Sequence, residues 1–156
     1  MPAQSDATRV MGVARFEHFF RAVAGLDVDK DDLKRYDEFV NRKIYRLLIR
    51  AQAVAKANLR DVIEPHDLPI TAGLQECIQD FRRVDVEIEL QPILDRIAAL
   101  PPLDLACSPS TESELPAIAG GIGVALARTF KVIEPKLRNP QSDHWERAFR
   151  VFDLLL

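Results

Sequence analysis

The segment RDVIEPHD, Arg60–Asp67, interrupts an otherwise helical pattern in the first half of the chain. Before it, over about Asp32–Asn58, apolar residues recur every three or four positions, which predicts one helix roughly 40 Å long. Val62 and Ile63 predict a brief extended piece, and Pro65 predicts a turn. A helix of this length must be a central spine, because no neighbour in a small domain could cover only one of its ends. Its predicted apolar stripe is Leu33, Tyr36, Val40, Ile44, Leu47, Ala51 and Val54.

Shorter helices are predicted on both sides of this central pair of elements. Met11–Ala24 carries an apolar stripe and ends before Gly25, a residue suited to a helix C-terminus. After the connecting segment, Asp67 is the predicted N-cap of a third helix, with Pro69 in its first turn. The order is thus a medium helix, a very long helix, an extended link and a short helix.

The remainder of the chain repeats this order with different residues. A short helix is predicted over Glu89–Leu100, followed by a proline-punctuated loop. A second long helix is predicted to open at Ser113 with Pro116 in its first turn. A last helix follows, with Asp143 as its predicted N-cap and Trp145 on its apolar face.

Two three-helix units, residues 1–84 and 85–156, therefore fill the chain. Each unit alone would expose the apolar face of its long helix and would bury too little surface to be stable. Packing the two long helices across each other removes this problem within one molecule. The predicted fold class is all-α, with both units forming one compact domain.

The connecting segment also carries a family resemblance. In archaeal and eukaryotic histones, an arginine and an aspartate seven positions later clamp the loop after the long helix, and Arg60 and Asp67 match that spacing. The stretches VMGVARFEHFFRAVAGLDVDKDDLKRYDEFV and RDVIEPHDLPITAGLQE resemble a bacterial family of uncharacterised proteins, the domain of unknown function 1931 family. The resemblance implies two tandem histone folds, packed as an intramolecular pseudodimer through a handshake of the long helices.

The second unit departs from the histone pattern at its clamp. Arg138 stands in the corresponding loop, but the residue seven positions later is Trp145. The nearest acid, Asp143, comes too early, so this clamp is expected to be degraded or differently built.

Several histone positions that meet DNA also differ. Where archaeal histones carry cationic or hydroxyl residues just after the clamp arginine, this chain has Asp61 and Val62. The positions that align with a histone arginine on the first helix and with one before the long helix hold Phe19 and Val28. The resemblance therefore implies that several of the usual DNA contacts are missing.

One cationic stripe remains as a candidate DNA-contacting surface. Arg42, Arg46 and Arg50 recur every four residues opposite the apolar stripe of the first long helix, with Arg35 and Lys43 nearby. Such a stripe would follow the phosphates of a duplex.

The alternative for this stripe is a solvated face, which we favour. Glu38 precedes Arg42 by four residues and Asp31 precedes Arg35 by four, the spacing of ordinary surface ion pairs. The whole chain has 21 basic and 24 acidic residues, a net charge of −3, which is unfavourable for a protein held to DNA by bulk charge.

Nothing in the sequence predicts a catalytic, cofactor-binding or metal-binding residue. No glycine-rich phosphate loop or nucleophile motif is present, and His18, His66 and His144 are scattered. The acidic run Asp27–Asp32 lacks the glycine of a calcium loop and is better explained as helix-start acids.

The expected compartment is the reducing cytoplasm. Cys77 and Cys107 form neither a disulfide framework nor a zinc motif, and the amino terminus is no signal peptide. No apolar run approaches the roughly 20 residues of a membrane span, so no membrane partner is expected.

The sequence leads to two functional hypotheses. The first is a non-enzymatic, histone-like protein that binds duplex DNA weakly and salt-sensitively and associates with the nucleoid. The second is a protein–protein interaction or scaffold module with a histone fold and no DNA affinity. The terminal sequence FDLLL, residues 152–156, also offers apolar side chains for self-association through the carboxy-terminal helices.

Overall fold

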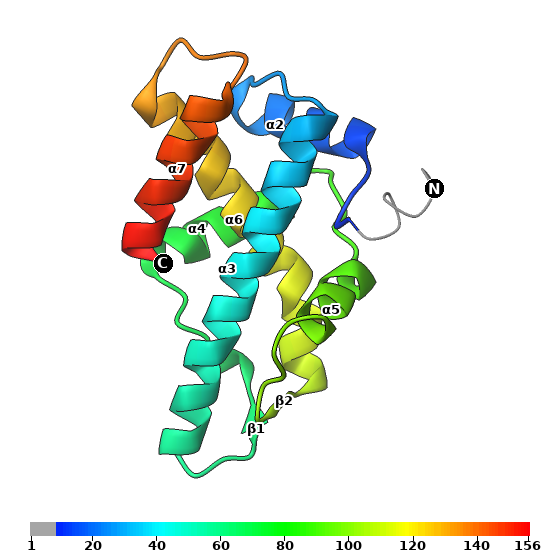
Figure 1. The fold of residues 1–156 in the computed structure, drawn as a ribbon, viewed down its shortest axis with the longest axis vertical. Helices are drawn as coiled ribbons and strands as arrows, with labels where there is room; N and C mark the ends of the chain where they lie inside the picture. The colour runs from blue at the N-terminus through cyan, green and yellow to red at the C-terminus, as the bar shows by residue number, and fades with distance from the viewer. Residues whose placement is uncertain (1–8) are drawn as a thin grey trace.

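Two long helices, α3 (Lys30–Ala57) and α6 (Pro109–Ile133), cross at the centre of the molecule (Figure 1). The structure, a computed structural model, describes residues 9–156. Residues 1–8, which the sequence analysis assigns to the first unit, lie outside the described range. The remaining helices flank the crossing: α2 (Val13–Ala24), α4 (Ala72–Arg82), α5 (Leu90–Ala98) and α7 (Ser142–Leu155).

The element order repeats as predicted, with α2, α3 and α4 followed by α5, α6 and α7. The predicted all-α class and the pairing of two three-helix units are therefore confirmed. The boundary between the units at residue 84 stays a prediction.

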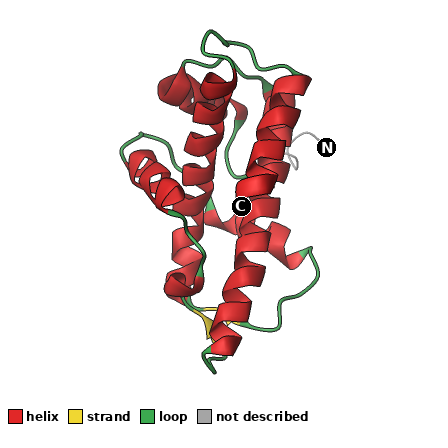
Figure 2. Cartoon of the chain, turned by 90° about the vertical axis from the view of Figure 1, so that its left-hand side faces the viewer, coloured by secondary structure: helices red, strands yellow, loops and turns green. Residues whose placement is uncertain are grey.

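The two units are joined at both ends of the crossing by paired loops. At the lower end (Figure 2), β1 (Val62–Ile63) pairs in parallel with β2 (Ala106–Cys107). At the opposite end, the amide of Asp27 donates a hydrogen bond to the carbonyl of Arg138 over 2.7 Å. Each loop pair brings the loop after one long helix against the loop before the other, so both ends close in the same way.

The first long helix begins two residues earlier than predicted. Asp29 is its N-cap and accepts from the amide of Asp32, whose carboxylate accepts in return from the amide of Asp29. This reciprocal capping box satisfies two amides of the first helical turn. The aspartates before α3 thus start a helix, as expected.

Three other helix starts differ from the predictions. Asp67 does not cap α4; the hydroxyl of Thr71 does, accepting from the amide of Leu74 over 3.1 Å. Asp67 instead ends a single 3₁₀ turn, η1 (Pro65–Asp67). The N-cap of α7 is Gln141 rather than Asp143.

The second long helix begins four residues before the predicted start. Ser108 is its N-cap and accepts from the amide of Thr111, and Pro109 occupies the first helical position. Pro116, predicted in the first turn, lies inside the helix.

One core is shared by the two units. Phe20 of α2 lies 5.6 Å from the Tyr36 ring of α3 and 6.1 Å from the Trp145 ring of α7, measured between ring centroids. The Trp145 ring also packs against Phe130 of α6. Trp145 is 1% exposed, which confirms it as a core residue. Because side chains from both units fill the same interior, the described chain forms one hydrophobic core.

The glycines of α6 allow its close approach to α4. A Cβ atom on Gly120 would lie 2.3 Å from the Phe81 ring, and one on Gly121 would lie 2.4 Å from the Ile78 side chain. Larger residues at these two positions would force the helices apart.

Within the described residues, α6 is also the one helix long and apolar enough to meet the length and composition criteria for crossing a membrane. It packs against α2, α3, α4 and α7, so burial in the core explains its apolar character.

Candidate macromolecule-binding surface

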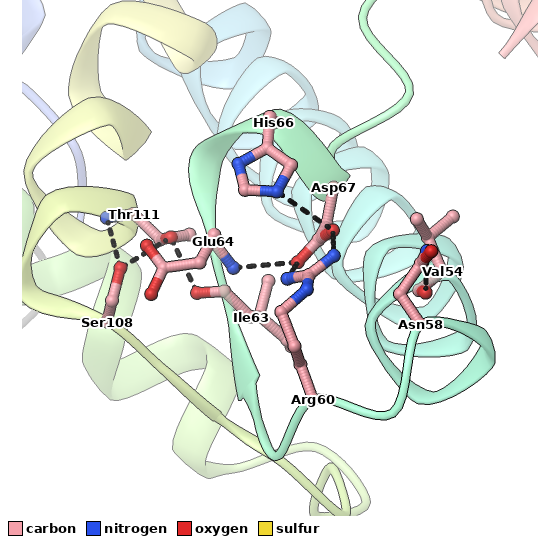
Figure 3. A network of polar contacts seen from close by, with 9 residues as sticks. All are labelled: Val54, Asn58, Arg60, Ile63, Glu64, His66, Asp67, Ser108 and Thr111. Atoms are coloured by element: carbon pink, nitrogen blue, oxygen red, sulfur yellow. Dashed lines mark hydrogen bonds and ion pairs between the residues drawn. The ribbon is translucent and has the colours of Figure 1, made fainter.

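The loop clamp forms the contact that the sequence predicts (Figure 3). Arg60 Nη1 donates to Asp67 Oδ2 over 2.6 Å, and Arg60 Nη2 donates to Asp67 Oδ1. The amide of Glu64 donates to the same carboxylate over 2.8 Å. The Asp67 side chain is fully buried, whereas that of Arg60 is 31% exposed. The hydrogen bonds from Arg60 lower the pKa of Asp67 to about 2.

The clamp lies next to the joint between the two units. The carbonyl of Ile63 accepts from the hydroxyl of Thr111 over 2.7 Å and from the amide of Ser108 over 3.0 Å (Figure 3). The clamped loop of the first unit therefore holds the start of α6 in the second unit. Since both charges of the clamp are paired with each other, its role here is structural.

The corresponding loop of the second unit is closed differently. His144 Nδ1 accepts from the amide of Gln141 over 2.9 Å, as Asp67 accepts from Glu64. This leaves Nε2 as the protonated ring nitrogen, and it lies 3.6 Å from a carboxylate oxygen of Glu134. The expectation of a differently built clamp is confirmed, with a histidine in place of the acid.

The positions that align with histone DNA contacts are not available as cations. Phe19 is fully buried, and Val28 is 9% exposed. Asp61 is exposed beside the clamp and would oppose a phosphate. At the same end, Lys56 forms an ion pair with Asp104 of the second unit, which neutralises that lysine.

The predicted cationic stripe is shorter in the structure than in the sequence. The structure corrects the expectation that Lys43 lies on the exposed face, since its side chain is 1% exposed. Lys43 Nζ donates to Asp153 Oδ1 of α7 over 2.6 Å and lies 5.6 Å from the centroid of the Phe39 ring. Hydrogen bonding to Lys43 lowers the pKa of the Asp153 carboxyl. This lysine therefore joins α3 to α7 and cannot reach a duplex.

The four arginines of the stripe have different surroundings. Arg35 Nη2 donates to Ser142 Oγ at the start of α7 over 2.7 Å, and Arg42 lies over the Phe39 ring. Arg46 is 55% exposed and lies 3.9 Å from Asp153, and Arg50 is exposed.

The ion pairs predicted for the stripe are not formed. Within residues 9–156, Arg42 has no ion pair with Glu38 and Arg35 has none with Asp31. The freely exposed part of the stripe is therefore Arg42, Arg46 and Arg50.

The same part of α3 borders a groove that sequence reasoning missed. The groove has a volume of about 500 Å³ and lies between α3, the segment leading into α4, and the end of α7; we call it the α3–α7 groove. Its floor and walls are mainly apolar, and Arg46 and Arg50 line it from α3. The lining includes Leu47, Ile49, Pro69, Thr71 and Leu155.

The end of α7 exposes apolar side chains beside this groove. Leu154 is 87% exposed and Leu155 is 73% exposed. This agrees with the expectation that the terminal leucines face solvent. The groove itself has no signal in the sequence, because its walls come from three segments that are far apart in the chain.

Other candidate groups are isolated. Cys77 and Cys107 are free thiols, and burial raises the pKa of both. Within the described residues, no cluster of three potential metal ligands is present.

Comparison with known proteins places the chain in a family. The family model described as "Domain of unknown function (DUF1931)" matches residues 16–153, most of the chain. The chain belongs to the DUF1931 family. The crystal structure of a protein from Thermus thermophilus is 54% identical to this DUF1931 chain, with a TM-score of 0.90. It covers 94% of this chain and 99% of its own.

More distant relatives agree with this assignment. An uncharacterized protein of Aquifex aeolicus (strain VF5) is 26% identical over 145 residues, which cover 93% of the DUF1931 chain and 84% of that relative. The crystal structure of the histone from Methanopyrus kandleri is 14% identical and has a TM-score of 0.58, covering 86% of this chain and 90% of its own. This likeness shows the fold alone. The DUF1931 chain thus has the tandem histone fold that the sequence implied.

Proposed function

We propose that this DUF1931 chain is a non-enzymatic histone-fold module that works by binding another protein and has little affinity for duplex DNA. The observation that carries the proposal is the apolar α3–α7 groove with the exposed leucines beside it. Contiguous exposed apolar surface in a folded protein marks an interaction site more often than it serves stability. A cytoplasmic location, favoured by two free cysteines, and a unit boundary after residue 84 belong to the same proposal.

The placement of cations supports a protein partner over DNA. Phe19 and Val28 are part of the core, Asp61 is acidic, and Lys43 is paired with Asp153 in the interior. Non-specific DNA binding depends on the number of phosphates that are neutralised. A surface with so few free cations offers little of this electrostatic attraction.

Weak DNA binding with nucleoid association is the second candidate, because Arg42, Arg46 and Arg50 still form an exposed row. Three such contacts predict a slope of log affinity against log salt of about −2.7, from −0.9 for each neutralised phosphate. The sequence alone, counting about four contacts, predicts a steeper slope of roughly −3 to −4.

A gel-shift titration with duplex DNA separates the two candidates. We expect faint, sequence-independent retention at low salt and none at about 0.15 M salt. The double variant Arg42→Glu with Arg46→Glu should abolish any residual retention while the chain stays folded, because both side chains are exposed. Salt-resistant or sequence-selective binding would contradict the proposal and would establish the DNA function.

Self-association through the carboxy-terminal helices is a further part of the proposal to be tested by sedimentation. Because the two units share one core, a single chain should remain folded at high dilution. Association at higher concentration that is lost in Leu154→Ser would assign the exposed leucines to a second copy. Unfolding on dissociation to one chain would contradict a self-sufficient pseudodimer.

A further inference from the structure

The two sides of the exposed end of α7 differ in charge. On the side of α3, the α3–α7 groove is lined by Arg46 and Arg50. On the side of α4 and α6 lies a second groove of about 360 Å³, which shares Leu155 with the first. Among the described residues, every side chain that lines this second groove is uncharged, including Leu74, Ala125 and Val151. Together the grooves form an apolar surface with arginines along one edge only.

The charge on that edge is not neutralised locally. Within the described chain, no carboxylate side chain lines the α3–α7 groove. Asp153, the acid of the adjoining helix, accepts from the buried Lys43 and lies 3.9 Å from Arg46. Because Lys43 already takes the close contact with Asp153, the guanidinium groups of Arg46 and Arg50 remain free to bind an anionic group.

We infer that this surface binds a partner helix whose apolar stripe fills the two grooves and whose acidic residues lie along one flank. The inference rests on the proposed protein-binding function and specifies its ligand. An apolar stripe entering a hydrophobic groove is a common mode of peptide recognition. Carboxylates on the flank facing α3 would each form charge-assisted hydrogen bonds with an arginine fork. Acids on the other flank would meet an uncharged wall and would lose water without gaining a partner.

A second copy of the chain matches this surface less well. The exposed face of its own last helix carries Arg147 and Arg150 next to Leu154. Placing that face in the groove would bring these arginines toward Arg46 and Arg50, which is unfavourable.

The test uses the folded chain and labelled synthetic helical peptides followed by fluorescence anisotropy. The probe peptide carries leucines at helical spacing with glutamates on one flank, and its matched control carries lysines in place of the glutamates. We expect saturable binding of the glutamate peptide and none of the lysine peptide.

Variants of the chain locate the binding surface. Arg46→Glu with Arg50→Glu should weaken binding of the glutamate peptide by at least about tenfold, as loss of two charge-assisted contacts and their reversal require. Lys30→Glu with Lys34→Glu makes the same change in net charge at exposed positions in the first turns of α3 and should leave affinity within about twofold. Thermal unfolding of each variant confirms that it is folded.

Several results would overturn the inference. These are equal binding of the lysine peptide, equal loss in both double variants, displacement of the peptide by laurate at lower concentration, or a stable dimer that excludes the peptide. Absence of saturable peptide binding, with the gel shift also negative, would reject this ligand and leave the protein-binding proposal standing. Tight DNA binding in the gel shift would reject the proposed function itself.

Discussion

The loops after the two long helices have the same task and different chemistry. In the first unit, the buried Asp67 carboxylate accepts from the Glu64 amide and is held by both terminal nitrogens of Arg60. In the second unit, the imidazole of His144 accepts from the Gln141 amide. In both loops the acceptor lies three residues after the amide that it satisfies.

The difference shows that the essential interaction is the backbone cap and that the arginine is an addition to it. The cap can be supplied by any side-chain acceptor at the third position. Only the first unit adds a guanidinium, and that loop pairs β1 with β2 and holds the start of α6. The first loop should therefore contribute more stability, and by a charge-dependent mechanism. Four measurements test this comparison.

The largest effect is expected for Asp67→Ala. The change leaves the Glu64 amide and the partly buried Arg60 guanidinium without their acceptor. Lost hydrogen bonds to a charged group predict a fall in the free energy of unfolding of about 2–4 kcal/mol. Urea unfolding measures it, with the exposed neighbour Asp61→Ala as the control. An unchanged midpoint for Asp67→Ala would show that the clamp adds no stability.

Acid should remove the same contribution. The folded-state pKa of Asp67 is about 2, below the value of about 3.9 for an unpaired aspartate, so ionised Asp67 stabilises the folded chain. That stability is complete above about pH 4 and is lost as the pH falls through about 2. We expect the difference in unfolding free energy between the wild type and Asp67→Asn to shrink over this range. A pH-independent difference would mean that the carboxylate charge is unimportant.

A smaller effect is expected for His144→Ala. This change removes one neutral acceptor of the Gln141 amide and predicts a loss of about 0.5–1.5 kcal/mol in the free energy of unfolding. His144→Asp retains an acceptor at the same position and should recover part of the loss. If His144→Asp is as unstable as His144→Ala, the cap does not explain the role of His144.

The smallest effect is expected for Arg138→Ala. The side chain of Arg138 is exposed, and the contact across the joint to Asp27 uses its backbone carbonyl. Its truncation should change the free energy of unfolding by less than about 0.5 kcal/mol. Arg60→Ala should cost about 1.5–3 kcal/mol, because it removes charged hydrogen bonds to a buried carboxylate. Equal losses in the two variants would remove the proposed difference between the loops.

The helix starts show where local signals are sufficient. The aspartates before α3 are followed by one strongly periodic segment, and the predicted start lies two residues from the observed one. Before α6, two serines, Ser108 and Ser113, each precede a proline in the sequence, and local rules favour both. The choice of Ser108 depends on Thr111, whose hydroxyl donates to Ile63 in the other unit. No local pattern contains that contact.

The candidate surface is predictable only in part. Four-residue spacing places Arg42, Arg46 and Arg50 together on one exposed face, and the structure agrees. Lys43, one position further round the helix, lies against α7 because Asp153, 110 residues later in the chain, pairs with it. The α3–α7 groove requires the same packing of α7 on α3 and is therefore outside the reach of periodicity.

The order of the helices, the shared handshake core and the Arg60–Asp67 clamp all follow from the amino-acid sequence. Each of these depends on the period of apolar residues or on groups within one turn or loop, for which position in the chain sets position in space. Three features emerge only in the folded chain: Lys43 is buried, His144 replaces an acid, and α7 leaves two adjoining apolar grooves with arginines on one edge. These features arise where distant segments pack, because burial and pairing of a charge depend on which neighbours the fold brings to it.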